Sequence, residues 1–344
     1  MAGGASTPAL VASVAACGGM GLLAAGYKTP DLLAEEIREV RNRSGHPFGV
    51  NVFVPQAPPG DPAGVERFRR ELAPEAAAAG VDLPSIRIAD DDRFGEKIAL
   101  LCELRVAVVS FTFGLPSAEI VAALHLVGSS VIATVTSVVE ARRADALGVD
   151  ALCVQGPEAG GHRGTFATED EPGTVPLREL VRAIHAESDL PLVAAGGIHS
   201  GEQMAALLAA GATAVQLGTA FLRTDESGAN QTHREALVAA RFDRTVITRA
   251  FSGRAARGLR NAFIVEHGAG APRAYPQVHH LTAPLRAAAA RRGDPDGLAL
   301  WAGTGFRAAK SGPAAGVVSR FWAECRERVG PTPSTSKLGP CAAD

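Results

Sequence analysis

The sequence predicts an α/β fold assembled from repeated βα units, either a doubly wound parallel sheet or a (β/α)8 barrel. Short apolar runs alternate along the chain with longer amphipathic stretches, and each pair takes up about 25–45 residues. Most of the runs are apolar throughout, which is typical of parallel strands that helices cover on both faces. The 344-residue chain is long enough for one large barrel with an appendage.

Seven strands are expected, at 19–25, 48–54, 106–112, 130–136, 150–155, 191–195 and 214–218. The helices expected between them cover 30–43, 62–79, 93–104, 116–127, 137–147, 176–187 and 200–210. Thr29 before Pro30 and Ser200 three residues before Gln203 are helix N-terminal signals. Seven strands are one short of a closed barrel, so the missing strand would have to precede Met1.

The alternation of strands and helices stops at Thr245, where Ala- and Arg-rich segments begin. We therefore predict a barrel domain over 1–244 that carries the cofactor and the catalytic residues. A helical extension over 245–329 is expected to pack on the barrel. The final segment, 330–344, is rich in Pro, Ser, Thr and Gly and is expected to be disordered.

Composition and charge exclude several classes of partner. The formal net charge of −2 gives no basic field for nucleic acid or an anionic membrane. The five cysteines form no CxxC pair and no metal-ligand spacing, so we expect reduced thiols, no metal site and a cytoplasmic protein. Residues 1–27 carry no charge, but glycines and prolines interrupt them and no basic segment precedes them. We interpret this stretch as buried barrel core rather than a signal peptide or membrane span.

The segment QGPEAGGHRG, residues 155–164, follows an expected strand and has the composition of an active-site loop. His162 comes after two glycines at the strand end, where an imidazole can act as a general acid or base. Glu158 is either a second catalytic group or, as we favour, a residue that orients the loop. The other histidines are interpreted as surface or unremarkable residues.

Two further strand ends carry glycines that favour phosphate binding over simple turn formation. Gly196-Gly197 leads into the capped helix at 200–210, and Gly218 follows the next strand in the run QLGTAFL, 216–222. Glycines let backbone N–H groups approach a phosphate, and helix N-termini favour its charge. In barrels, the loops after strands 7 and 8 are a recurrent phosphate site.

Asn51 and Gln155 are carboxamides within or at the end of expected strands. Burying an unpaired carboxamide costs about 1–3 kcal/mol, so both side chains must have partners. A hydrogen bond to a neighbouring loop is one possibility, and contact with a ligand ring that has donor and acceptor edges is the one we favour.

With these residues identified, the chain resembles the nitronate monooxygenases, formerly called 2-nitropropane dioxygenases, from Met1 to about Lys310. The late blocks resemble the class I branch of that family. The resemblance rests on MAGGASTPAL (1–10), GVNVFVPQ (49–56), VVSFTFGLP (108–116), QGPEAGGHRG (155–164), AAGGI (194–198), QLGTAFL (216–222), GRAARGLRNAF (253–263) and LWAGTGF (300–306).

The resemblance implies a TIM barrel that binds FMN non-covalently and uses His162 as its catalytic residue. It implies oxidation of alkyl nitronates, such as propionate 3-nitronate, by O2 to an aldehyde or ketone plus nitrite. His162 would remove the α-proton of a neutral nitroalkane or, as imidazolium, help to hold the anion. The partners would be this small molecule and O2, and the protein a monomer or homodimer. The implied FMN contacts are Asn51, Gln155, Gly160, Gly197, Gln216, Leu217, Gly218 and Thr219.

The surroundings of such a site are hypotheses from position alone. Phe53, Phe111 and Phe113 could line a dry pocket for the substrate. The basic residues of 254–260 could reach an anionic substrate, but we favour a solvated helix face for Arg254, Arg257 and Arg260.

One departure concerns the first strand. Members of the family carry an N-terminal strand that ends in a segment like APM, whose last residue would align with Met1. Either that strand lies upstream of the printed start or the barrel lacks it and leaves edges unpaired. The chain as printed is expected to be less stable and to bind FMN more weakly than one with the strand.

Two other functions compete with the first. One is an FMN-dependent enoyl-ACP reductase of the related barrel type, which would consume NAD(P)H. The other is a flavin-binding protein that has lost catalysis.

Overall fold

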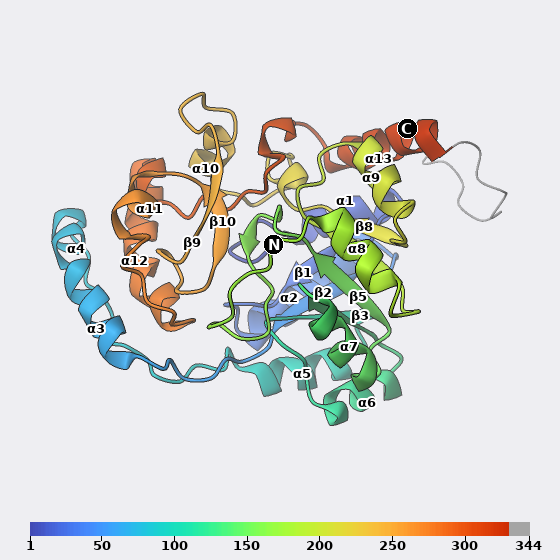
Figure 1. The fold of residues 1–344 in the computed structure, drawn as a ribbon, viewed down its shortest axis with the longest axis horizontal. Helices are drawn as coiled ribbons and strands as arrows, with labels where there is room; N and C mark the ends of the chain where they lie inside the picture. The colour runs from blue at the N-terminus through green and yellow to red at the C-terminus, as the bar shows by residue number, and fades with distance from the viewer. Residues whose placement is uncertain (330–344) are drawn as a thin grey trace.

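The described part of this computed structural model is residues 1–329, and seven parallel strands within it form one curled sheet (Figure 1). The predicted tail at 330–344 lies outside the described residues. The strand order is β1-β2-β3-β4-β5-β7-β8. The strands are β1 (Leu22–Ala24), β2 (Gly49–Phe53), β3 (Val108–Thr112), β4 (Ser130–Val135), β5 (Ala151–Gln155), β7 (Leu192–Ala195) and β8 (Ala214–Gln216).

All seven predicted strands are confirmed, and the fold is an α/β barrel of the TIM type. Neighbouring strands follow one another along the chain, which is the order that sequential right-handed βα units produce. In residues 1–329, β1 and β8 lie at the two ends of the sheet and do not pair with each other. The sheet is therefore open between β1 and β8, where a closed barrel would have one more strand.

The helices cover the outer face of this sheet, and the apolar residues between the two layers form the main core. The helices that follow the strands are α2 (Pro30–Arg43), α5 (Phe94–Glu103), α6 (Ala118–Leu126), α7 (Val138–Leu147), α8 (Leu177–His185) and α9 (Gly201–Leu208). The uncharged N-terminal stretch forms α1 (Pro8–Ala16), whose Leu10 and Val11 belong to this core as expected. The last helix, α13 (Ala314–Val329), packs on α9 and α1.

A second layer covers one side of the barrel (Figure 1). The expected helix at 62–79 is two helices, α3 (Pro62–Glu71) and α4 (Ala73–Ala79), with Pro74 in the first turn of the second. They pack against α11 (Ala262–His267) and α12 (Gln277–Arg292) around a separate apolar cluster that includes Phe68 and Phe251. We call this layer, α3 and α4 with α11 and α12, the cap.

The predicted helical extension after Thr245 contains helices and, in addition, strands that were not predicted. The segment contains two strands, β9 (Thr245–Thr248) and β10 (Ala256–Leu259), which form a small antiparallel sheet with β6 (Gly161–His162). These strands are short, and β10 pairs with a partner far upstream in the chain, so local periodicity gives no sign of them. The extension also contains the short turns η2 (Pro295–Gly297) and η3 (Phe306–Ala308), whereas η1 (Thr219–Phe221) and α10 (Gln231–Ala236) precede it.

Candidate active site

The loop after β5 carries His162 back over the carboxyl end of the sheet. His162 lies in β6 and pairs with Ala256 of β10, so the small sheet fixes its backbone. Gln155, the last residue of β5, holds the loop from below. Its Nε2 donates to the His162 carbonyl at 3.0 Å, and its Oε1 accepts from the Gly164 N–H at 2.8 Å. The position of the imidazole is thus set by strand pairing and by one carboxamide.

Aromatic rings surround the His162 imidazole. The ring of Phe113 lies edge-on at 5.7 Å between centroids, and those of Tyr275 and Trp301 each lie at 5.5 Å. Phe53 packs on Phe113 at 4.5 Å. Two of the three predicted pocket phenylalanines, Phe53 and Phe113, therefore lie beside the imidazole as expected.

Phe111, the third predicted pocket residue, does not line this pocket. It is fully buried in the main core and packs against Phe94 of α5 on the helix side of the sheet. Successive side chains of a strand point to opposite faces, so Ser110 and Thr112 face the barrel interior while Phe111 faces outward. Phe113 follows the end of β3 in a left-handed conformation, with φ of 77°, and escapes this alternation.

The environment of His162 keeps its imidazole neutral. Burial, followed by the positive charges of Arg254 and Arg286, lowers the pKa of His162 to about 3. Its Nε2 lies 2.8 Å from Ser252 Oγ, which can donate its single proton to the Arg254 carbonyl at 3.1 Å. In that arrangement Nε2–H donates to the hydroxyl and Nδ1 keeps a lone pair. A neutral ring with a free lone pair is in the form that a general base needs.

Arg254 is a buried structural residue, and the expectation of a solvated helix face was wrong. Its side chain is 1% exposed, in the loop before β10, and the guanidinium lies over the Phe113 ring at 4.1 Å. All three guanidinium nitrogens donate hydrogen bonds inside the protein, to acceptors on Gln56, Arg163, Thr165 and Thr168. Arg254 therefore has no donor left for a substrate and acts on the pocket through its charge.

The other two members of that basic cluster lie apart from the pocket. Arg257 is in β10 and donates from Nε to the Pro157 carbonyl at 2.9 Å, so it braces the loop that follows β5. Arg260 is exposed. A strand–loop segment spreads these side chains, whereas a helix would have placed them on one face.

Several residues of the pocket were missed by sequence reasoning, among them two tyrosines, a histidine and an arginine. The chain has only two tyrosines, and their hydroxyls meet at 2.8 Å beside His162. The Tyr27 ring also stacks on His279 at 3.9 Å, and His279 accepts from Arg286. Tyr275, His279 and Arg286 lie in α12 or just before it, and only the tertiary fold brings them to Tyr27 and His162. The rarity of tyrosine was the one usable signal in the sequence.

A cradle of backbone N–H groups lies at the ends of β7 and β8. Ala195 and Gln216 are paired, so Gly197 and Gly218, each two residues further on, are neighbours. Among the described residues, the N–H groups of Gly197, Gly218 and Thr219 donate to no acceptor. Gly197 has φ of 67°, and a Cβ there would lie 2.5 Å from the Glu158 Cβ. Free N–H donors on glycine turns fit the phosphate of a nucleotide cofactor.

The loop 302–305 closes this cradle from the side. A Cβ on Gly160 would lie 2.5 Å from the Gly303 nitrogen, and the Gly303 N–H donates to Thr219 Oγ1 at 3.0 Å. The Glu158 carboxylate accepts from the Leu177 N–H at 3.3 Å, and its carbonyl accepts from the Thr304 N–H at 3.1 Å. Glu158 thus orients the loop, as we favoured, and Gly160 permits the close approach of two backbones.

Asn51 occupies the floor of the same region. Its Nδ2 donates to Ser110 Oγ at 3.1 Å and to Thr112 Oγ1 at 2.9 Å, which confirms that the buried carboxamide has partners. Within residues 1–329, its Oδ1 accepts no hydrogen bond. Gln216 is exposed and Leu217 partly buried at the end of β8, beside the cradle.

The comparison with protein families decides the relationship. The family described as nitronate monooxygenase matches residues 1–324. The chain belongs to this family. A probable nitronate monooxygenase of Staphylococcus aureus (strain Newman) is 39% identical over 321 residues, which cover 92% of this chain and 90% of that protein. The chain is therefore an enzyme of the flavin-dependent oxidoreductase type.

Two solved structures are similar to this chain over more than nine tenths of its length. A nitroalkane oxidase from Streptomyces ansochromogenes is 50% identical, with a TM-score of 0.92 over 95% of this chain and 94% of that one. FabK from Thermotoga maritima is 28% identical, with a TM-score of 0.72 over 96% and 91% of the two chains. Within the described residues, no helix combines the length and apolarity needed to cross a bilayer.

Proposed function

We propose that this nitronate monooxygenase family member uses FMN to oxidise alkyl nitronates with O2, giving an aldehyde or ketone and nitrite. The observation that carries the proposal is the neutral His162 imidazole in an aromatic pocket between two cationic residues, Arg254 and Arg286. No carboxylate contributes to the pKa shift of His162. Such a pocket attracts a small anion and can take a proton from a neutral nitroalkane.

FMN fits the cradle beside this pocket. The unpaired N–H groups of Gly197, Gly218 and Thr219 would hold the phosphate. Asn51 Oδ1 is available to accept from the ring, and Gln155, Gly160, Gln216 and Leu217 are the remaining proposed contacts. When bound, FMN supplies an electron acceptor that can pass electrons on to O2.

The residues around the pocket bind the substrate, take its proton and exclude water. Arg286 has an Nη1 group that makes no hydrogen bond among residues 1–329, and we assign it the nitronate oxygens. His162 takes the α-proton when the substrate arrives as a neutral nitroalkane. The rings of Phe113, Tyr275 and Trp301 keep water away from the reacting carbon.

The test is an assay of the FMN-loaded protein with propionate 3-nitronate and a small panel of other nitronates. We expect nitrite release coincident with oxygen uptake, with no requirement for NAD(P)H. Protein that carries FMN but releases no nitrite from any nitronate would contradict the proposal and leave a flavin-binding protein without catalysis.

The similarity to FabK supports one second candidate, an NAD(P)H-dependent enoyl-ACP reductase. Anaerobic mixing separates the two functions, because a nitronate should bleach the flavin absorbance of the enzyme that we propose and NADPH should not. Bleaching by NADPH alone would favour the reductase.

A further inference from the structure

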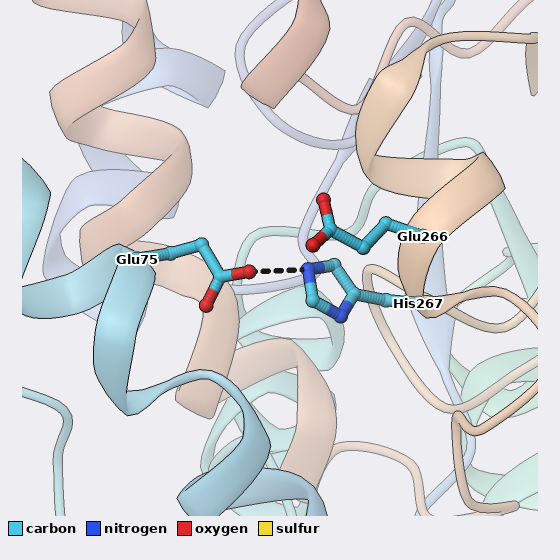
Figure 2. A group of neighbouring side chains, drawn as sticks. All are labelled: Glu75, Glu266 and His267. Carbon is cyan, nitrogen blue, oxygen red and sulfur yellow. Dashed lines mark ion pairs between the residues drawn. The ribbon is translucent and has the colours of Figure 1, made fainter.

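We propose that the cap holds a divalent transition-metal site, with Glu75, Glu266 and His267 as its protein ligands. Glu75 lies in the first turn of α4, and Glu266 and His267 end α11. One ligand atom from each residue lies within 4.8 Å of the other two. Figure 2 shows both carboxylates beside the same edge of the His267 ring.

The His267 ring is buried and aimed at the carboxylates. Its side chain is 8% exposed, and its Nε2 lies 3.0 Å from Glu75 Oε1, at ion-pair distance but without the geometry of a hydrogen bond (Figure 2). Phe263 packs against the ring at 4.5 Å and Phe68 at 6.1 Å, so its orientation is set by the cap core. A ligand that is already oriented loses little freedom when it binds an ion.

The protein alone leaves this group incompletely paired. Glu75 Oε2 and His267 Nε2 are both buried atoms with no hydrogen-bond partner in the described structure. Buried polar atoms are normally paired, and an unpaired one calls for an explanation such as an ion. One dication would satisfy both carboxylates and the imidazole together.

The ligand set identifies the class of metal. An imidazole nitrogen with two carboxylate oxygens suits Zn²⁺ and its transition-metal neighbours, whereas Mg²⁺ and Ca²⁺ prefer oxygen alone. Ligand bonds of about 2.0–2.2 Å need the three atoms somewhat closer together than they now lie. Glu266 is exposed, so rotation of its side chain can close the group without moving the backbone.

The consequence would be a clip between two segments that are nearly 200 residues apart in the chain. The α3–α4 segment is an insertion between β2 and α5, and α11 belongs to the extension after the barrel. Their shared apolar cluster is separate from the barrel core, so an ion here would add to the stability of the cap.

The test uses the full-length protein, treated with a chelator and then titrated with ZnCl2 in a calorimeter. We expect one saturable site per chain and a higher Tm with Zn²⁺ than without it. Glu266→Gln should weaken Zn²⁺ binding at least about tenfold, because one charged ligand is lost. His267→Asn should abolish binding.

Glu71→Gln is the matched control, since Glu71 is an exposed acidic residue at the end of α3 outside the three-residue group. It should bind Zn²⁺ as the parent chain does. Glu266 is exposed, so its variant should fold even if the buried His267 substitution does not. Absence of a saturable site, or a site that Glu266→Gln leaves unchanged, would overturn the proposal, whatever the flavin content of the sample.

Discussion

At the scale of single residues, His162 determines which form of the substrate the enzyme can use. His162→Asn keeps a polar side chain that can form hydrogen bonds but removes the base. We expect a loss of about 10²–10⁴-fold in kcat/KM for neutral nitroalkanes, the usual contribution of a general base. Preformed nitronates need no deprotonation, so the kcat/KM of the variant for them should fall far less. Steady-state kinetics with both forms of one substrate, at matched FMN content, measures the difference, and equal losses would remove the assigned role.

For Arg286 we expect the opposite pattern, a larger effect on anionic nitronates than on neutral nitroalkanes. Its Nη1 is the free donor that we assign to the nitronate oxygens, while Nε and Nη2 are held by Thr282 and His279. A lost hydrogen bond to a charged group costs about 1.5–3 kcal/mol, so Arg286→Met should raise KM for anionic nitronates roughly 10–100-fold. Neutral nitroalkanes should be affected less. Arg260→Met, an exposed arginine of the extension, is the control and should change neither KM.

The candidate site residues that sequence reasoning predicted are those that a local pattern indicates. His162 and the glycines at 160, 197 and 218 stand at strand ends, where the βα rhythm alone indicates the edge that binds ligands. Ser252, Tyr275 and Arg286 were missed because they reach His162 from segments about 90–120 residues away, and no periodicity encodes such contacts. Gln155 stays a predicted FMN contact, and in addition both ends of its carboxamide hydrogen-bond to the loop.

At the scale of elements, the contact between the loop after β5 and the loop 302–305 forms one wall of the cradle. Gly160→Ala would place a Cβ 2.5 Å from the Gly303 nitrogen and 2.6 Å from the Ala302 carbonyl carbon. Overpacking of this kind costs roughly 1–3 kcal/mol, and here it would push the two loops apart. We expect a lower FMN content and a lower Tm. Gly95→Ala in α5, where a Cβ meets nothing within 4 Å, should preserve both values.

The start of α5 positions Tyr27 across the pocket. Lys97 is 0% exposed and pairs with Asp92 at 2.7 Å, and the Asp92 carboxylate accepts from the Tyr27 N–H at 3.2 Å. Burial lowers the pKa of Lys97 and raises that of Asp92 despite their mutual attraction. The ion pair therefore stabilises the fold little and serves mainly to hold Tyr27, whose φ is 68°.

Removing one partner of this ion pair separates stability from substrate binding. Lys97→Met leaves the partly buried Asp92 carboxylate without its cation and should cost about 1–3 kcal/mol of the free energy of unfolding. The double variant Lys97→Met/Asp92→Asn should recover most of that stability but keep a raised KM with little change in kcat, because an amide oxygen holds the Tyr27 N–H more weakly than the carboxylate does. Arg93→Ala, at an exposed ion pair of the same helix, is the control. A double variant with the parental KM would contradict the positioning role.

At the scale of the whole molecule, the barrel could be predicted from the sequence but the cap could not. Seven apolar runs became the seven strands of one sheet, since each run is buried by helices and leaves a local signal. The small β6-β10-β9 sheet joins residues 162 and 256, and its strands are too short to show alternation. The position of α3 and α4 against α11 and α12 depends on packing alone. Local pattern thus predicts the repeated unit, and long-range contacts build the pocket on it.

The fold also holds three partly buried histidines in their neutral form, and this gives its stability a dependence on pH. Burial lowers the pKa of His162 to about 3 and that of His233 to about 4, and it holds the pKa of His279 well below its usual range. In the unfolded chain each imidazole titrates near about 6.5. Between these values the unfolded chain binds more protons than the folded one, so the free energy of unfolding falls as the pH falls below about 6.5.

Thermal unfolding at a series of pH values from about 7.5 to 5.5, where the carboxylates stay ionised, measures this dependence. Each buried histidine should contribute up to about 1.4 kcal/mol per pH unit below its unfolded pKa. His233 lies in α10, outside the pocket, so His233→Gln should flatten the decline of Tm without changing the catalytic residues. His125→Gln, at an exposed His–Asp pair, should leave the decline as it is in the parent chain. A Tm that stays constant over this range would show that the three imidazoles take up protons in the folded state after all.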